Sequence, residues 1–239
     1  MLKLSEDFKI YYPVKIKDGI YFEKFKPNKS PEPYFSGIRA VEPVSIFFTG
    51  KPEEKRIIMG VKACDIAGLR VLDKIIKDEN YHKMRKETIL VTADCPFPEE
   101  TCFCNLRGIE PYCDEDADIV ISPLGDRYLL QAISDRGKKI IDKTKNILSI
   151  ATESDIAEKL RIRKEAKEKL KVINEREFKS IKENCVRCFG CRYICPTCYC
   201  EEKICSFEER IECKAENCTG CGRCISVCPG MLDIRSYLK

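Results

Sequence analysis

Tryptophan is absent from this chain of 239 residues, and histidine occurs once. A single histidine argues against a zinc site built on imidazole ligands and against a histidine general base. Apolar runs are short, such as Val44 to Phe48, and none approaches the roughly 20 residues that a membrane helix needs. Glu6 and Asp7 stand where a signal peptide would be apolar. We therefore expect a cytoplasmic protein without a membrane span.

The chain also lacks a block of basic residues. Its 43 lysines and arginines are spread along the sequence and are nearly balanced by 39 acidic residues. A nucleic-acid-binding surface usually needs a concentrated basic patch, so nucleic acid is not an expected partner. Fingerprints of dinucleotide and phosphate-loop binding are missing as well.

What the sequence has in abundance is cysteine, with 17 residues. Cytoplasmic thiols are normally reduced, so metal or iron-sulfur ligation explains them better than disulfides do. Five cysteines lie between Cys64 and Cys113, and the other twelve follow from Cys185 onward. This grouping predicts one domain over residues 1–150 and a second over 185–239. Between them, the Lys- and Glu-rich stretch from Thr152 to Asn184 has apolar residues near helical spacing. This predicts a helical linker over 151–184, formed by one long helix or by a helix with one break.

The N-terminal domain contains a predicted strand-helix-strand unit. Arg56 to Val61 is a short apolar run typical of a buried strand, Asp65 to Lys77 is amphipathic, and Glu87 to Ala93 is a second strand. Such a unit places its two strands in parallel. Further strands are expected at 118–122 and 127–133, and residues 1–50 are expected to be rich in β-structure, including a short run at 45–48. We predict an α/β or α+β domain.

Two copies of the motif C-x2-C-x2-C-x3-C-P lie near the C-terminus, at 185–196 and 218–229. The motif is typical of bacterial ferredoxins with two 4Fe-4S clusters, in which the fourth cysteine of each copy binds the other cluster. A pair of zinc ribbons would need neither the third cysteine nor the C-x3-C-P ending. The predicted ligands are Cys185, Cys188, Cys191 and Cys228 for one cluster, and Cys195, Cys218, Cys221 and Cys224 for the other.

Four more cysteines are expected to meet at one edge of the N-terminal sheet. Cys64 and Cys95 each follow one of the two parallel strands, and the carboxyl ends of parallel strands share the edge where ligands usually bind. Cys102 and Cys104 come soon after Cys95, within reach of a loop that folds back. We predict a third 4Fe-4S cluster on these four cysteines. The alternative is a group of buried free thiols, which pack as small apolar side chains.

The remaining cysteines give no defined pattern. The spacing of Cys198, Cys200, Cys205 and Cys213 matches no known motif, so a fourth cluster and structural thiols are both open. Cys113 is left over as a spare.

Taken together, the motifs resemble those of a known family. Gly60-Val-Lys-Ala-Cys-Asp65, Thr101-Cys-Phe-Cys104, Cys195-Pro-Thr-Cys-Tyr-Cys200 and Cys218-Thr-Gly-Cys-Gly-Arg-Cys224 resemble the iron-sulfur electron-transfer (beta) subunits of archaeal cytosolic sulfhydrogenases. The same family includes the A subunit of anaerobic sulfite reductase. The resemblance runs from about Arg39 onward. It implies a protein that relays electrons between two partner subunits. One partner binds flavin and nucleotide, and the other is catalytic and contains metal, as in a hydrogenase or sulfite reductase.

The favoured function is thus electron transfer within a multi-subunit oxidoreductase, with no catalytic residue in this chain. The alternative is an oxidoreductase subunit that binds flavin or deazaflavin in its N-terminal domain and has its own active site there.

Overall fold

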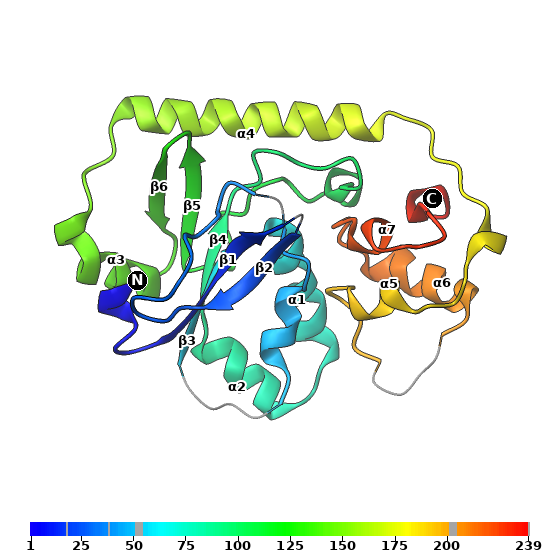
Figure 1. Ribbon diagram of the computed structural model, residues 1–239, viewed down its shortest axis with the longest axis horizontal. Helices are drawn as coiled ribbons and strands as arrows, with labels where there is room; N and C mark the ends of the chain where they lie inside the picture. The colour runs from blue at the N-terminus through cyan, green and yellow to red at the C-terminus, as the bar shows by residue number, and fades with distance from the viewer. Residues whose placement is uncertain (18, 38, 51–54, 201–204, 239) are drawn as a thin grey trace.

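The computed structural model describes residues 1–239 except 18, 38, 51–54, 201–204 and 239. A sheet with its helices forms the N-terminal part, and short helices and loops form the C-terminal part (Figure 1). The long helix α4 (Glu153–Asn174) runs along one side of the sheet toward the C-terminal part (Figure 1). No described helix is both long and apolar enough to cross a membrane.

The sheet has six strands in the order β2-β1-β3-β4-β5-β6. The four central strands are parallel and the two outer ones are antiparallel to their neighbours. Their bounds are β1 Lys9–Ile16, β2 Gly19–Lys24, β3 Arg56–Val61, β4 Ile89–Ala93, β5 Ile119–Leu124 and β6 Arg127–Ala132. The register places Ile57 opposite Ile89 and Val91 opposite Ile119. The prediction of an α/β N-terminal domain with parallel strands is confirmed.

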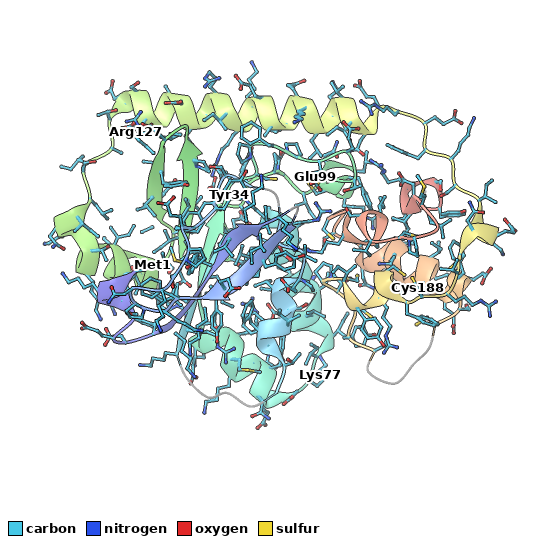
Figure 2. The ribbon with its side chains drawn as sticks, viewed as in Figure 1. Met1, Tyr34, Lys77, Glu99, Arg127 and Cys188 are labelled. Carbon is cyan, nitrogen blue, oxygen red and sulfur yellow. The ribbon has the colours of Figure 1, made fainter. Side chains whose placement is uncertain are left out.

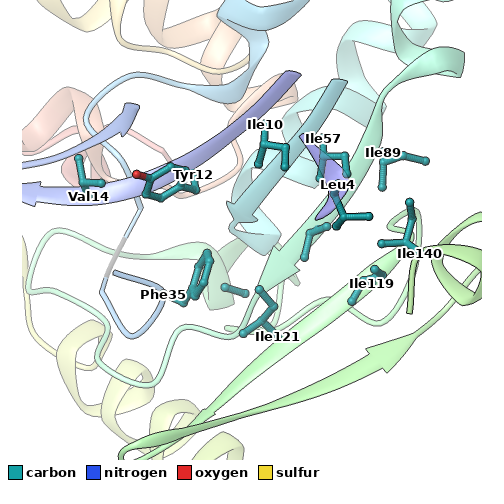
Figure 3. Close-up of a cluster of buried hydrophobic side chains, with 12 residues drawn as sticks. Leu4, Ile10, Tyr12, Val14, Phe35, Ile57, Ile89, Ile119, Ile121 and Ile140 are labelled. Atoms are coloured by element: carbon teal, nitrogen blue, oxygen red, sulfur yellow. The ribbon is translucent and has the colours of Figure 1, made fainter. Parts of the chain in front are cut away.

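Alternating side chains of these strands build one apolar cluster on each face of the sheet. On one face, Ile57, Ile119 and Ile121 pack with Tyr12 and with Ile140 of α3 (Asp135–Thr144), as Figure 3 shows. On the other face, strand residues pack against α1 (Ala63–Ile75) and α2 (Glu79–Glu87). Burial on both faces explains why the central strands are continuous apolar runs.

Two expected elements differ in the structure. The run at 45–48 is not a strand but part of a 3-10 helix, Val44–Phe48, which buries Val44 and Phe48 without pairing to the sheet. The helix expected over 152–184 begins as predicted, with a capping box at Thr152, but ends at Asn174. There the Asn174 amide donates to the carbonyls of Leu170 and Cys102. Contacts distant in sequence thus override the helical propensity of the following residues.

The described residues of the C-terminal part form the α-helices α5 Gly190–Tyr193, α6 Phe207–Asn217 and α7 Arg223–Ser226. Short 3-10 helices complete the described elements, at Leu2–Leu4, Cys104–Arg107, Lys145–Ile147, Lys182–Asn184 and Ile234–Ser236. Helix α6 lies in the segment that separates the two cysteine motifs, and a second capping box, at Ser206, begins it.

Candidate metal centres

Both C-terminal cysteine motifs fold with the same backbone conformation. The second and fourth residues after the first cysteine have positive φ in each copy: Arg187 (53°) and Phe189 (59°) in one, Gly220 (63°) and Gly222 (74°) in the other. A short helix, α5 or α7, follows each loop. Alternating left- and right-handed residues turn successive backbone N–H groups into one concave nest, which is an anion-binding arrangement found at many iron-sulfur sites. The loops therefore suit groups of thiolates around a cluster.

The outer cysteine site consists of Cys185, Cys188, Cys191 and Cys228, which line one pocket. Apolar side chains of α6, including Ile211, line it as well. Arg210 of α6 donates from Nη1 to Cys191 Sγ over 3.1 Å. The amide of Leu232 lies 3.4 Å from Cys228 Sγ. Cys188 is exposed and lies in the C-terminal part, away from the sheet (Figure 2).

The middle cysteine site consists of Cys195, Cys218, Cys221 and Cys224, which surround the buried Lys214 of α6. Burial alone would lower the pKa of Lys214, but the four surrounding thiolates raise it above its ordinary value. Burial conversely raises the pKa of Cys224 to about 12 and that of Cys218 to about 11. The Gly220 amide lies 3.3 Å from Cys218 Sγ. Arg210 and Lys214 stand four residues apart on one face of α6, so one helix supplies a cation to each C-terminal site.

The N-terminal cysteine site consists of Cys64, Cys95, Cys102 and Cys104, and all four line a single pocket. Cys64 lies in the first turn of α1 directly after β3, and Cys95 follows β4, so the parallel sheet brings them to one edge. The 3-10 helix that begins at Cys104 returns the loop to the same pocket. The expected convergence of these four side chains is thus found in the structure.

Two buried cations, Arg39 and Lys62, also line the N-terminal pocket. Nη1 of Arg39 lies 3.4 Å from Cys102 Sγ, and Nζ of Lys62 donates to the carbonyls of Phe35 and Asp94. Burial raises the pKa of Cys102 to about 11 although Arg39 lowers it. A cluster bound by four thiolates is negatively charged, so buried cations and N–H donors fit this group.

The three sites adjoin one another in the order N-terminal, middle, outer. Cys221 belongs to the middle site but also lines the N-terminal pocket, and Cys224 of the middle site lines the outer pocket. Glycines make this contact possible: a Cβ on Gly222 would lie 2.1 Å from the Thr101 carbonyl oxygen. Glu99, which pairs with Arg39, marks the same boundary between the two parts (Figure 2).

Three of the unassigned cysteines lie near Cys195 of the middle site. Cys198 and Cys213 each interact electrostatically with Cys195 and Cys200, and Cys213 is exposed. Cys205 follows residues 201–204, which lie outside the described residues. Among the residues described, no three Cys, His, Asp or Glu side chains are arranged to hold one metal ion. In a cubane cluster, by contrast, each thiolate binds a different iron.

Sequence reasoning missed the cations that accompany the thiols. The five are Arg39, Lys62, Arg210, Lys214 and Arg223, of which only Arg210 is not buried. Lys62 and Arg223 each stand within two residues of a candidate cysteine ligand, and this spacing could have indicated their proximity to the sites. Arg39 lies in an irregular segment with no pattern to distinguish it from the chain's other arginines.

Comparison with known proteins gives one informative match. The chain is 27% identical over 235 residues to the protein named sulfhydrogenase 2 subunit beta from Pyrococcus furiosus, an alignment that covers 84% of this chain and 69% of that subunit. No family model matches. The match confirms the predicted resemblance to sulfhydrogenase beta subunits.

Proposed function

Because the chain is a relative of sulfhydrogenase beta subunits, we propose that it is the iron-sulfur electron-transfer subunit of a multi-subunit oxidoreductase. In this proposal it holds three 4Fe-4S clusters, on the N-terminal, middle and outer cysteine sites. The clusters supply one-electron transfer. The chain's own residues hold the clusters in line, exclude water from them and offset their charge.

One observation carries the proposal: the three four-cysteine sites form an uninterrupted series. Cys221 and Cys224 of the middle site each line a neighbouring pocket, one on either side. A single storage cluster would not need such neighbours, whereas a relay needs each site next to the following one. The exposed Cys188 at one end, beside Val186 with 66% of its surface exposed, gives the series an accessible terminus.

Electron paramagnetic resonance (EPR) of the anaerobically reconstituted, fully reduced chain tests this order. Adjacent reduced clusters broaden each other's signals through magnetic coupling, which falls steeply with distance. Cys218→Ser should remove the middle cluster and leave two uncoupled, narrow signals, whereas Cys113→Ser should leave the coupled spectrum unchanged. Uncoupled signals in the unmodified chain would contradict the series, and so would coupling that survives in Cys218→Ser.

Two partners are proposed for this relay, one a subunit that contains flavin and the other a catalytic subunit that contains metal. Each would approach one end of the series, because the middle site is enclosed by α6 and the N-terminal part. Purification of a tagged chain from its native source should recover both partners. Cross-linking from a photoreactive residue placed at position 186 should then label one of them and not the other.

A second candidate is the flavin-binding oxidoreductase subunit, and one cavity favours it. A pocket of about 360 Å³ lies where the N-terminal and C-terminal parts meet. Tyr34 and Phe97 line it, and so do Arg39 and Arg223. Aromatic faces and cations suit a planar molecule with an anionic tail. Stoichiometric flavin in the chain purified alone would favour this candidate over a pure relay, whereas a chain that lacks flavin and fails to bind added flavin would remove it.

A further inference from the structure

Arg39 and Arg223 each reach from one part of the molecule to bind the other part. From the N-terminal part, Nη2 of Arg39 donates to Ser226 Oγ over 3.0 Å. From the C-terminal part, Nε of Arg223 donates to the Ala40 carbonyl over 3.0 Å. Nη2 of Arg223 also pairs with Asp65 over 2.9 Å. Both arginines are almost wholly buried, with 6% and 2% of their surface exposed. Each side chain therefore lies within the boundary between the two parts and not in solvent.

Each of the two guanidinium groups keeps one buried N–H without an acceptor. Among the described residues, Nε of Arg39 and Nη1 of Arg223 are buried nitrogens with no hydrogen-bond partner. Unpaired buried donors are rare because they lose their water without compensation. The other nitrogens of both groups have acceptors, so the exception is specific to these two atoms.

The anionic groups around the pair are mainly cysteines of the candidate sites. Cys102, Cys221 and Cys64 act electrostatically on Arg39, and Cys221 and Cys64 act on Arg223 beside Asp65. Nη1 of Arg39 already lies 3.4 Å from Cys102 Sγ. The two arginines therefore stand between the N-terminal and middle sites and face sulfur from both parts of the chain.

Resting on the proposed function, we propose that Arg39 and Arg223 are positioning residues that raise the reduction potential of the N-terminal cluster. Arg39 lines the N-terminal pocket, so its free N–H would donate to sulfur of a cluster held there. The charges of both arginines, which act on Cys64 and Cys221, favour the more negative, reduced cluster. A guanidinium remains protonated throughout the accessible pH range, so the effect is permanent. Because the pair also joins the two parts, the same residues fix the distance over which the N-terminal and middle clusters exchange electrons.

A redox titration followed by EPR tests the proposal on the full, reconstituted chain. Cys95→Ser first identifies the N-terminal cluster's signal by its disappearance. Arg39→Gln should then make that cluster at least tenfold harder to reduce, which corresponds to about 59 mV for one electron. Arg39→Lys keeps the charge and should retain most of the potential. Arg85→Gln, which removes a partly buried guanidinium that is ion-paired with Asp73, should leave every cluster unchanged.

Several outcomes separate this proposal from the proposed function. If the unmodified chain gives no signal that Cys95→Ser removes, the third cluster itself is absent and the relay is wrong. If that signal is present but Arg39→Gln shifts it no more than Arg85→Gln does, the role of the arginine is overturned. An equal shift in Arg39→Lys and Arg39→Gln would also overturn it, because loss of charge could not be the cause.

Discussion

The backbone amide of Phe103 donates a 2.8 Å hydrogen bond to the carbonyl of Gly220. Phe103 stands between Cys102 and Cys104 of the N-terminal cysteine site, and Gly220 precedes Cys221 of the middle site. One backbone hydrogen bond thus joins two loops that carry candidate ligands. In the proposed relay, this contact provides a short covalent and hydrogen-bonded route between the two sites.

Gly220→Ala should separate the two parts at this contact. A Cβ there would lie 2.5 Å from the Phe103 carbonyl oxygen and 2.6 Å from the Cys104 amide nitrogen. The positive φ is not the main obstacle, because Arg187 adopts it at the same position in the other motif. We expect backbone strain and overpacking together to lower the free energy of unfolding by about 3 kcal/mol. That loss would lower the thermal unfolding midpoint by about 10 °C.

Gly125→Ala is the matched control for this change. Gly125 has nearly the same φ, +64°, but nothing lies within 4 Å of a Cβ built there. Gly125→Ala should lower the free energy of unfolding by about 1 kcal/mol, the cost of a left-handed backbone for a residue with a Cβ. That corresponds to a fall of about 3 °C in the thermal unfolding midpoint. Equal shifts in the two variants would show that Gly220 is needed for its φ alone.

The sheet was predictable because its strands are buried on both faces. Runs such as 57–61 and 89–91 contain no polar side chain, and such runs flanking an amphipathic stretch specify parallel strands. The 3-10 helix at 44–48 was not predictable, because a short apolar run fits any buried segment. The end of α4 at Asn174 was not predictable either, since the Asn174 side chain there binds the Cys102 carbonyl, which is far away in sequence.

Cys95→Ser should cost the protein one cluster, and Cys113→Ser should cost none. Both cysteines are partly buried and lie in the same stretch after β4, which makes them a fair pair. Cys95 lines the N-terminal pocket, whereas Cys113 Sγ donates to the Glu115 carbonyl over 3.0 Å. Iron and acid-labile sulfide per chain provide the measurement. If Cys95→Ser kept its full iron content, the N-terminal site would be a group of free thiols and not a cluster site.

Cys195→Ser and Cys198→Ser distinguish a candidate ligand at the end of the first motif from a cysteine just after it. Burial would raise the pKa of the Cys195 thiol, but Lys214 and the Thr197 hydroxyl lower it overall. Burial and the neighbouring Cys195 raise the pKa of Cys198, and Arg192 offsets only part of this rise. We expect Cys195→Ser to lose the middle cluster and Cys198→Ser to keep all iron. A loss of iron in Cys198→Ser would instead indicate a fourth cluster.

The convergence of cysteines was predictable from topology, but their electrostatic surroundings were not. Cys64 and Cys95 meet because parallel strands end at one edge, a rule that needs no side-chain detail. Arg39, by contrast, reaches the N-terminal pocket from an irregular segment, and Lys214 reaches the middle site from a helix whose position depends on packing. When a single charged side chain reaches a site that is distant in sequence, no periodic pattern in the sequence predicts it.

Arg163→Met should destabilise the protein and loosen the N-terminal cysteine site together. Arg163 of α4 binds both oxygens of the buried Asp94, at 2.8 and 2.9 Å, and also binds Asp114. Asp94 directly precedes Cys95, so this ion pair fixes the backbone beside a candidate ligand. Removing one partner of a buried pair leaves an uncompensated charge and costs about 3–5 kcal/mol. The exposed pair Arg161–Glu165 supplies the control, since Arg161→Met should cost only about 0.3–0.5 kcal/mol.

The effect of Arg163→Met should also depend on pH. A hydrogen bond from Arg163 lowers the pKa of Asp114 below its ordinary value. A carboxyl group whose pKa is lowered by folding stabilises the folded state above its unfolded pKa. That stabilisation is lost as the pH falls through the folded value. Thermal unfolding from pH 7 downward should therefore show the largest gap between the unmodified chain and Arg163→Met near neutrality. The gap should narrow below about pH 4. A gap that stays constant over this range would mean that Arg163 stabilises the protein through its contact with the Tyr112 ring, 4.2 Å away, rather than through the carboxylates.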